Sequence, residues 1–214
     1  MISYIFKNKT KNILAIIFTI LSFLNSNIMY NIYAYAIARK FPLLSVFRLL
    51  PYILILTYLF TLKKEYRFKN YLFPAAFLIF AALNSYSVLT SLIQNLKYLN
   101  TSELIIWFVW TALYGLVVLA AYILCFLGAI KNFKNVRFLR IGMIVLMVAM
   151  LLSYVMDFIF VGGFEYFANI PQENSLYVYI SMLRAVVKIV IGLLFCFGIF
   201  NLTLNKQEEA AETE

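Results

Sequence analysis

The stretch LIIWFVWTALYGLVVLAAYILCFLGAI, residues 104–130, decides the fold class, because its 27 consecutive residues include no charged side chain. About 20 apolar residues are enough for a helix to cross the hydrocarbon core of a bilayer. Hydrocarbon offers no hydrogen-bond partners, so a crossing segment must satisfy its own backbone, as an α-helix does. The stretch therefore predicts a transmembrane helix.

The rest of the chain has the same character. Of its 214 residues, 64% are hydrophobic and 13% are charged, whereas soluble domains have about 45–50% apolar and about 25% charged residues. Apolar runs predict six spans, at 13–36, 43–62, 71–93, 104–130, 141–162 and 177–204. The predicted fold is therefore all-α, a polytopic integral membrane bundle of six transmembrane helices. It forms one domain over residues 1–205, followed by a short acidic cytoplasmic tail at 206–214.

The distribution of Lys and Arg predicts how the helices are oriented. Twelve of the 18 Lys and Arg residues flank the spans on one side, and three lie on the other side. Cytoplasmic loops carry the excess of basic residues. Both termini are therefore predicted to be cytoplasmic, in a multi-pass protein of the bacterial cytoplasmic membrane. The same topology explains the net charge of +9, so a nucleic-acid partner is not expected.

The first span has two interpretations. Its basic start and apolar run are shared with secretory signal peptides, and Ala34-Tyr35-Ala36 matches a small-x-small cleavage pattern. The stretch from Asn25 to that pattern is long and rich in Tyr, which favours an uncleaved helix. Cleavage would leave five spans in the same orientation.

Residues for catalysis and metal binding are few. The chain has no histidine, which disfavours most zinc and haem sites and the Ser-His-Asp type of mechanism. Cys125 and Cys196 lie inside apolar spans and are interpreted as packing residues. Acid–base chemistry would depend on Asp157 and Lys188 alone, so an enzyme is disfavoured. No catalytic residue, metal or cofactor is predicted.

Four ionisable residues lie inside predicted spans: Arg48, Asp157, Arg184 and Lys188. At a helical rise of about 1.5 Å per residue, the first three fall roughly 6–10 Å below the outer surface, and Lys188 falls one turn deeper. An unpaired charge in lipid costs at least about 2.5–3.5 kcal/mol. These side chains are therefore predicted to face the bundle interior, where Asp157 offsets one cation. Snorkelling of Arg48 and Arg184 to the outer headgroups is the alternative.

Uncharged polar residues are also concentrated in the outer halves of the spans. Asn27, Tyr30 and Asn31 lie there in the first span, and Asn84 lies there in the third. The inner halves are mostly Ile, Leu, Val, Phe and Ala. This bias predicts a polar, net-cationic cavity that opens to the outside and is closed below by apolar packing.

Aromatic residues divide into two groups. Trp107 and Trp110 begin the fourth span at the outer interface and are interpreted as part of the aromatic belt of a membrane protein. Tyr52 lies one turn below Arg48 and is predicted to face the interior.

The sequence leaves two functions open. The first is binding or transport of a small anionic or zwitterionic solute. Its predicted ligand-binding residues are Arg48, Arg184, Lys188, Asp157, Asn27, Tyr30, Asn31 and Asn84. The second is a non-catalytic accessory, assembly or immunity role through contacts with helices or lipid. The expected partners are the lipid bilayer and either a small anionic ligand or another membrane protein.

Overall fold

A computed structural model describes residues 9–25, 43–61, 69–96, 102–133, 136–160 and 172–211 of the chain. These residues form six helices. They are α2 (Lys9–Asn25), α4 (Leu43–Phe60), α5 (Lys69–Asn95), α6 (Ser102–Phe133), α7 (Val136–Phe160) and α9 (Gln172–Ala211). The all-helical prediction is therefore confirmed for the part of the chain that is described.

Four of these helices are long and apolar enough to cross a membrane. Their crossing segments are Asn70–Gln94, Ile105–Ile130, Val136–Met156 and Ala185–Thr203. The apolar parts of α2 and α4, Lys11–Asn25 and Phe47–Phe60, are shorter. The remainder of the first predicted span, 26–36, lies outside the described residues. Helix α9 continues to Ala211, so the start of the acidic tail is helical.

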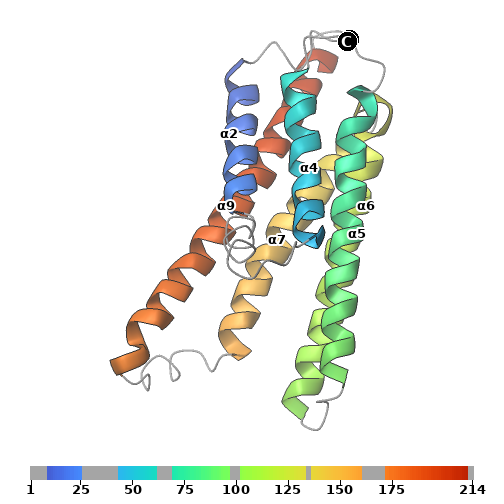
Figure 1. Ribbon diagram of the computed structural model, residues 1–214. Coiled ribbons are helices and arrows are strands. Elements are labelled where there is room, and N and C mark those ends of the chain that lie inside the picture. Colours follow the sequence, from blue (N-terminus) through green and yellow to red (C-terminus); the bar gives the residue numbers. More distant parts are fainter. Residues whose placement is uncertain are drawn as a thin grey trace.

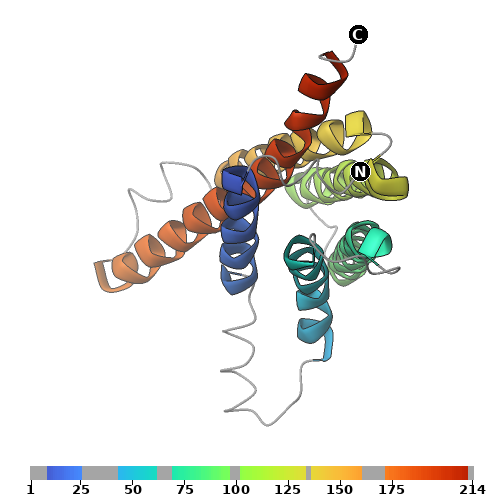
Figure 2. The ribbon, with the colours of Figure 1, turned by 90° about the horizontal axis from the view of Figure 1, so that it is seen from above.

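The helices form a ring in the order of the sequence. Each helix packs against the next one along the chain, and α9 returns to pack against α2. Neighbouring helices run in opposite directions, as Figure 1 shows, and Figure 2 shows the arrangement seen from above. This up-and-down order follows from short connections, which leave consecutive helices side by side.

The two ends of the ring are packed differently. The helices converge at the end that contains the starts of α2, α5 and α7, and α7 and α9 diverge from α5 and α6 at the other (Figure 1). We call these the packed end and the spread end. Among the side chains whose burial is described, none is buried in 82–96, 105–114, 150–156 or 182–194. The core therefore lies at the packed end.

That core is apolar and rich in aromatic rings. Its largest fully buried side chains include Ile55, Phe73, Phe77, Leu139, Met143 and Ile199. Cys125 and Cys196 are buried there as free thiols, as expected of packing residues. On the opposite, outward faces Leu, Ile, Val and Phe are widely exposed, which is what a lipid-facing surface requires.

Glycine residues allow the backbones of helices α6 and α7 to come into close contact. A Cβ atom built on Gly128 would clash with the backbone nitrogen of Leu139. One built on Gly142 would lie 2.5 Å from Sγ of Cys125 and 2.7 Å from the carbonyl oxygen of Ala121. Small residues permit this proximity and are typical of helix contacts in membranes.

A polar contact joins α7 to α9 at the packed end. Nε of Arg140 donates a hydrogen bond to Oγ1 of Thr203 at 3.0 Å, and its Nη2 donates to the Thr203 carbonyl oxygen. The Thr203 hydroxyl in turn donates to the carbonyl oxygen of Phe200 at 2.6 Å. The Arg140 guanidinium is thereby satisfied by the backbone and side chain of a neighbouring helix.

The glycine contact generates a stability prediction. Gly128→Ala should lower the free energy of unfolding by about 1–3 kcal/mol, because the new methyl group overpacks against a backbone atom that cannot move aside. The measurement is thermal unfolding in detergent with a thiol-reactive dye, which reports exposure of the buried Cys125 and Cys196.

Gly192→Ala is the matched control. The nearest atom to its added Cβ is Sδ of Met150 at 3.0 Å, at the flexible end of a side chain. Both substitutions add the same helix propensity, about 0.8–1.0 kcal/mol. Equal melting temperatures for the two variants would contradict the close α6–α7 contact.

Candidate functional site

Arg48 lies on the inward face of α4. It precedes Pro51, Ile55 and Leu59 by three, seven and eleven residues, so the four share one side of the helix. The three later residues are buried, whereas Arg48 is exposed. The outward face of the same helix carries exposed Ile53. The register therefore places Arg48 on the side of α4 that carries the buried residues.

Lys188 occupies the equivalent position on α9. It precedes Phe195 and Ile199 by seven and eleven residues, and both of these are buried. The opposite face carries Leu183, which is 65% exposed, and Val190, which is 47% exposed. Lys188 is itself exposed on the inward side. Two of the predicted site cations thus lie on faces that enter the bundle.

An aromatic cluster lies between these cations and the core. The Tyr52 ring makes edge contacts with Phe80 at 5.1 Å and with Phe195 at 5.6 Å between centroids. Phe80 stacks on Tyr122 at 5.4 Å. The cluster joins α4, α5, α6 and α9, so it fills the centre of the ring at this level. Such ring pairs add about 0.5–1.5 kcal/mol each beyond the burial of their area.

The cluster lies directly below both cations. Tyr52 is one turn from Arg48 on α4, and Phe195 is two turns from Lys188 on α9. Since the Tyr52 and Phe195 rings touch, the inward faces bearing the two cations converge on the same place. Tyr52 faces the interior as predicted. The sequence pointed to no cluster, because its four members come from four distant segments.

Asn84 makes a structural contact. Its Nδ2 donates a hydrogen bond to the Gly115 carbonyl oxygen of α6 at 3.2 Å. A Cβ on Gly115 would lie 2.6 Å from the Val88 side chain, so the two helices are in close contact here. One of the two N–H donors of the Asn84 amide is therefore used between α5 and α6. Its second N–H donor and its carbonyl oxygen are the groups that the predicted role in ligand binding would use.

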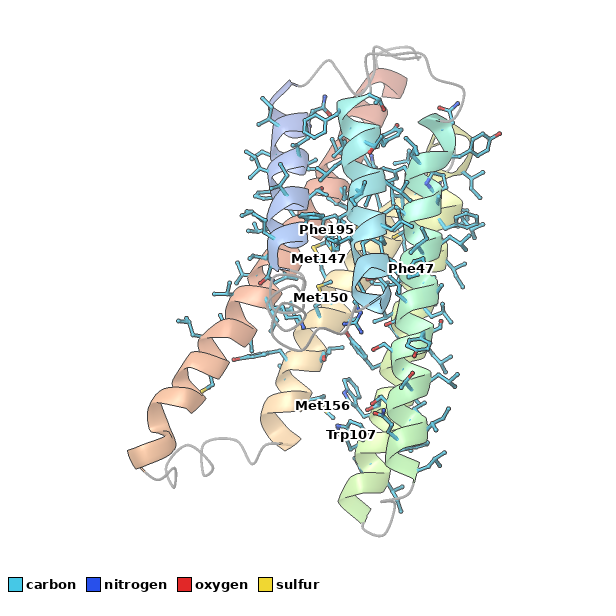
Figure 3. All side chains as sticks on the ribbon, viewed as in Figure 1. Phe47, Trp107, Met147, Met150, Met156 and Phe195 are labelled. Carbon is cyan, nitrogen blue, oxygen red and sulfur yellow. The ribbon has the colours of Figure 1, made fainter. Side chains whose placement is uncertain are left out.

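Trp107 lies on the inward face of its helix, and its interpretation as a belt residue stays a prediction. It precedes Val118 and Cys125 by eleven and eighteen residues, which places it on the inward face of α6, where it is half-buried. Figure 3 shows Trp107 and Met156 toward the spread end, and Met147, Met150 and Phe195 nearer the middle of the bundle. The indole belongs to the inward surface of the spread end.

The remaining predicted residues are only partly described. Helical register puts position 157 in line with Leu146 and Met150 of α7, and position 184 one turn from Lys188. The side chains at 157 and 184 lie outside those described, so the proximity of Asp157 and Arg184 stays a prediction. Asn27, Tyr30 and Asn31 lie outside the described residues altogether.

The two described cations, Arg48 and Lys188, are thus one to two helical turns from an aromatic cluster that joins their helices. Lys and Arg are hydrogen-bond donors without acceptor capacity, so this arrangement suits a negatively charged group. Within the described ranges, no group of three or more His, Cys, Asp or Glu side chains could hold a metal ion. The arrangement offers charge recognition and apolar contact.

Comparison with protein-family models, curated proteins and solved structures found no match to this chain. The fold itself defines the class, an all-helical bundle with four helices able to cross a membrane.

The inward placement of Lys188 can be tested by cysteine accessibility. A membrane-impermeant maleimide should modify Lys188→Cys several times faster than Val190→Cys, because thiolate formation needs water and residue 190 faces lipid. The native Cys125 and Cys196 are buried, which keeps the background low. Equal rates for the two variants would place Lys188 on the lipid-facing side.

Proposed function

We propose that the protein binds or transports a small anionic or zwitterionic solute between the helices of its spread end. The observation that carries this proposal is that Arg48 and Lys188 are exposed although the residues in register with them are buried. A cation on an inward face contributes little to packing. It is better explained by a ligand.

The energetic argument concerns uncompensated charge. Each cation that remains unpaired in the membrane costs at least about 2.5–3.5 kcal/mol. Position 184 adds a third cation one turn from Lys188, and like charges at this spacing repel. Asp157 supplies one negative charge to three cations. An anion bound from solution would offset the remainder.

The distribution of basic residues supports a site that opens to the outside. The packed end carries the segments richest in Lys and Arg, which are cytoplasmic by the positive-inside rule. The spread end is then extracytoplasmic. We propose six spans with both termini in the cytoplasm of a bacterial cell, and this topology lets a solute reach Lys188 from outside.

Reporter fusions test this topology. A fluorescent protein fused after Glu214 should fluoresce, and alkaline phosphatase inserted at Asn100, between α5 and α6 in the sequence, should be active, because that enzyme matures only outside the cytoplasm. Alkaline phosphatase can also be fused after Glu214. If phosphatase is inactive at residue 100 and active at residue 214, the orientation is the opposite of the one proposed.

The binding proposal is tested by native mass spectrometry of protein purified in mild detergent. A small anion should co-purify with the wild type and be lost from Arg48→Gln and Lys188→Gln. Hydrogen bonds to a charged group contribute about 1.5–3 kcal/mol each, so each variant should bind about 10- to 100-fold more weakly.

Arg137→Gln is the matched control, because it removes an exposed cation from the start of α7 at the packed end. It should retain the anion. Phospholipid or another protein bound equally by all four forms would contradict solute binding. That result would favour the accessory, assembly or immunity role, in which the charges serve lipid or partner helices.

A further inference from the structure

The groups directly below the cations restrict the kind of anion that fits. On α9, Gly192 lies one turn from Lys188 toward the packed end, and Sδ of Met150 lies 3.0 Å from the position of a Gly192 Cβ. On α4, the residue one turn from Arg48 is Tyr52, whose ring contacts Phe80 and Phe195. A thioether and aromatic rings therefore form the first surface below both charges.

Two polar side chains of α5 and α6 already use a donor within the protein. The Thr111 hydroxyl donates to the carbonyl oxygen of Trp107 at 2.9 Å, and Nδ2 of Asn84 donates to that of Gly115 at 3.2 Å. A compact hydrophilic anion such as phosphate needs several donors around it. Beyond the cations, the described inward surface offers mainly apolar contact.

Methionine makes that surface adaptable. Four of the seven methionines of the chain lie on α7, at positions 143, 147, 150 and 156. Met147, Met150 and Met156 are half-buried, and Figure 3 shows them at successive levels from the middle of the bundle toward the spread end. Unbranched, polarisable side chains of this kind reshape around varied apolar groups.

The depth of the surface limits the size of the apolar group. Lys188 and Phe195 are separated by seven residues, or about 10 Å at 1.5 Å per residue, and Arg48 and Tyr52 by about 6 Å. Below this level Phe80, Phe195 and Ile199 are buried in the core. A single aromatic ring or a short acyl chain fits this depth, whereas a full phospholipid acyl chain does not.

We infer that the ligand is an amphiphilic organic acid from solution, with its carboxylate at Arg48 and Lys188 and a short apolar body on Tyr52, Met150 and Phe195. This inference rests on the proposed function and narrows its solute class. The two charges select the acid, and the aromatic and thioether surface selects the apolar body.

The experiment uses the full chain in nanodiscs of zwitterionic phosphatidylcholine. Tryptophan fluorescence reports binding, because the two tryptophans of the chain both lie on α6 near the spread end. The probes are hexanoate, acetate, hexanamide and inorganic phosphate. Together they distinguish the contribution of the charge to binding from that of the apolar body. Lys188→Gln in the same nanodiscs corrects for partitioning of hexanoate into lipid.

Hexanoate should bind at least about tenfold more tightly than acetate, because its additional methylene groups are buried. Hexanamide and phosphate should bind at least about tenfold more weakly than hexanoate, because one lacks the charge and the other the apolar body. Met150→Gln keeps the size of the side chain but makes it polar. This variant should bind hexanoate several-fold more weakly than the wild type and should bind acetate with the same affinity.

The outcomes separate this inference from the proposed function. Acetate or phosphate bound as tightly as hexanoate would overturn the amphiphilic class and leave anion binding intact. No saturable, Lys188-dependent binding of any anion would overturn both. Repeating the titration with anionic phosphatidylglycerol in the nanodisc distinguishes the source. Full displacement of hexanoate by that lipid would show a lipid ligand and overturn the assignment to a soluble acid.

Discussion

A charged side chain inside a bilayer must reach water or an opposite charge, and the architecture of this protein depends on that requirement. The helices converge at the packed end, where their inward faces are apolar. On α4 and α9 the same faces carry Arg48 and Lys188, which are exposed. Close packing excludes water from the apolar part of these two faces, and no such packing covers the two exposed cations.

The packed end is built by interactions that need no hydrophobic effect between helices, since lipid is as apolar as a protein core. Backbone proximity at Gly128 and Gly142 maximises dispersion between α6 and α7. The contact of Arg140 with Thr203 joins α7 to α9. The aromatic cluster then fills the centre, where six helices arranged in a ring would otherwise leave a space. Directional and steric contacts thus replace the solvent-driven packing of a soluble domain.

The sequence predicted what depends on local composition. Hydropathy located the six helices of the described residues, because each apolar run is long compared with the error at its ends, and periodicity placed Tyr52 on an inward face. It could not predict the central cluster, since Tyr52, Phe80, Tyr122 and Phe195 meet only after the order of the helices is fixed. The inward face of Trp107 was not predicted, because composition alone does not show on which side of a helix a tryptophan lies. The bond from Asn84 to Gly115 could not be predicted because it is a contact between helices, and the role of Asn84 in ligand binding stays a prediction.

Helix α9 has 40 residues, which gives it a length of about 60 Å, twice the hydrocarbon thickness of about 30 Å. It leans away from the bundle at the spread end (Figure 1). Its other half is held at several levels, by the Ser22 hydroxyl, which donates to the Ile191 carbonyl oxygen, by buried Phe195 and by the Arg140 contact with Thr203. Such a rod has the mechanics of a cantilever that is clamped from Ile191 onward and overhangs by about 28 Å toward Gln172. A deflection of the overhang therefore grows toward Gln172, while the clamped half keeps its place in the bundle.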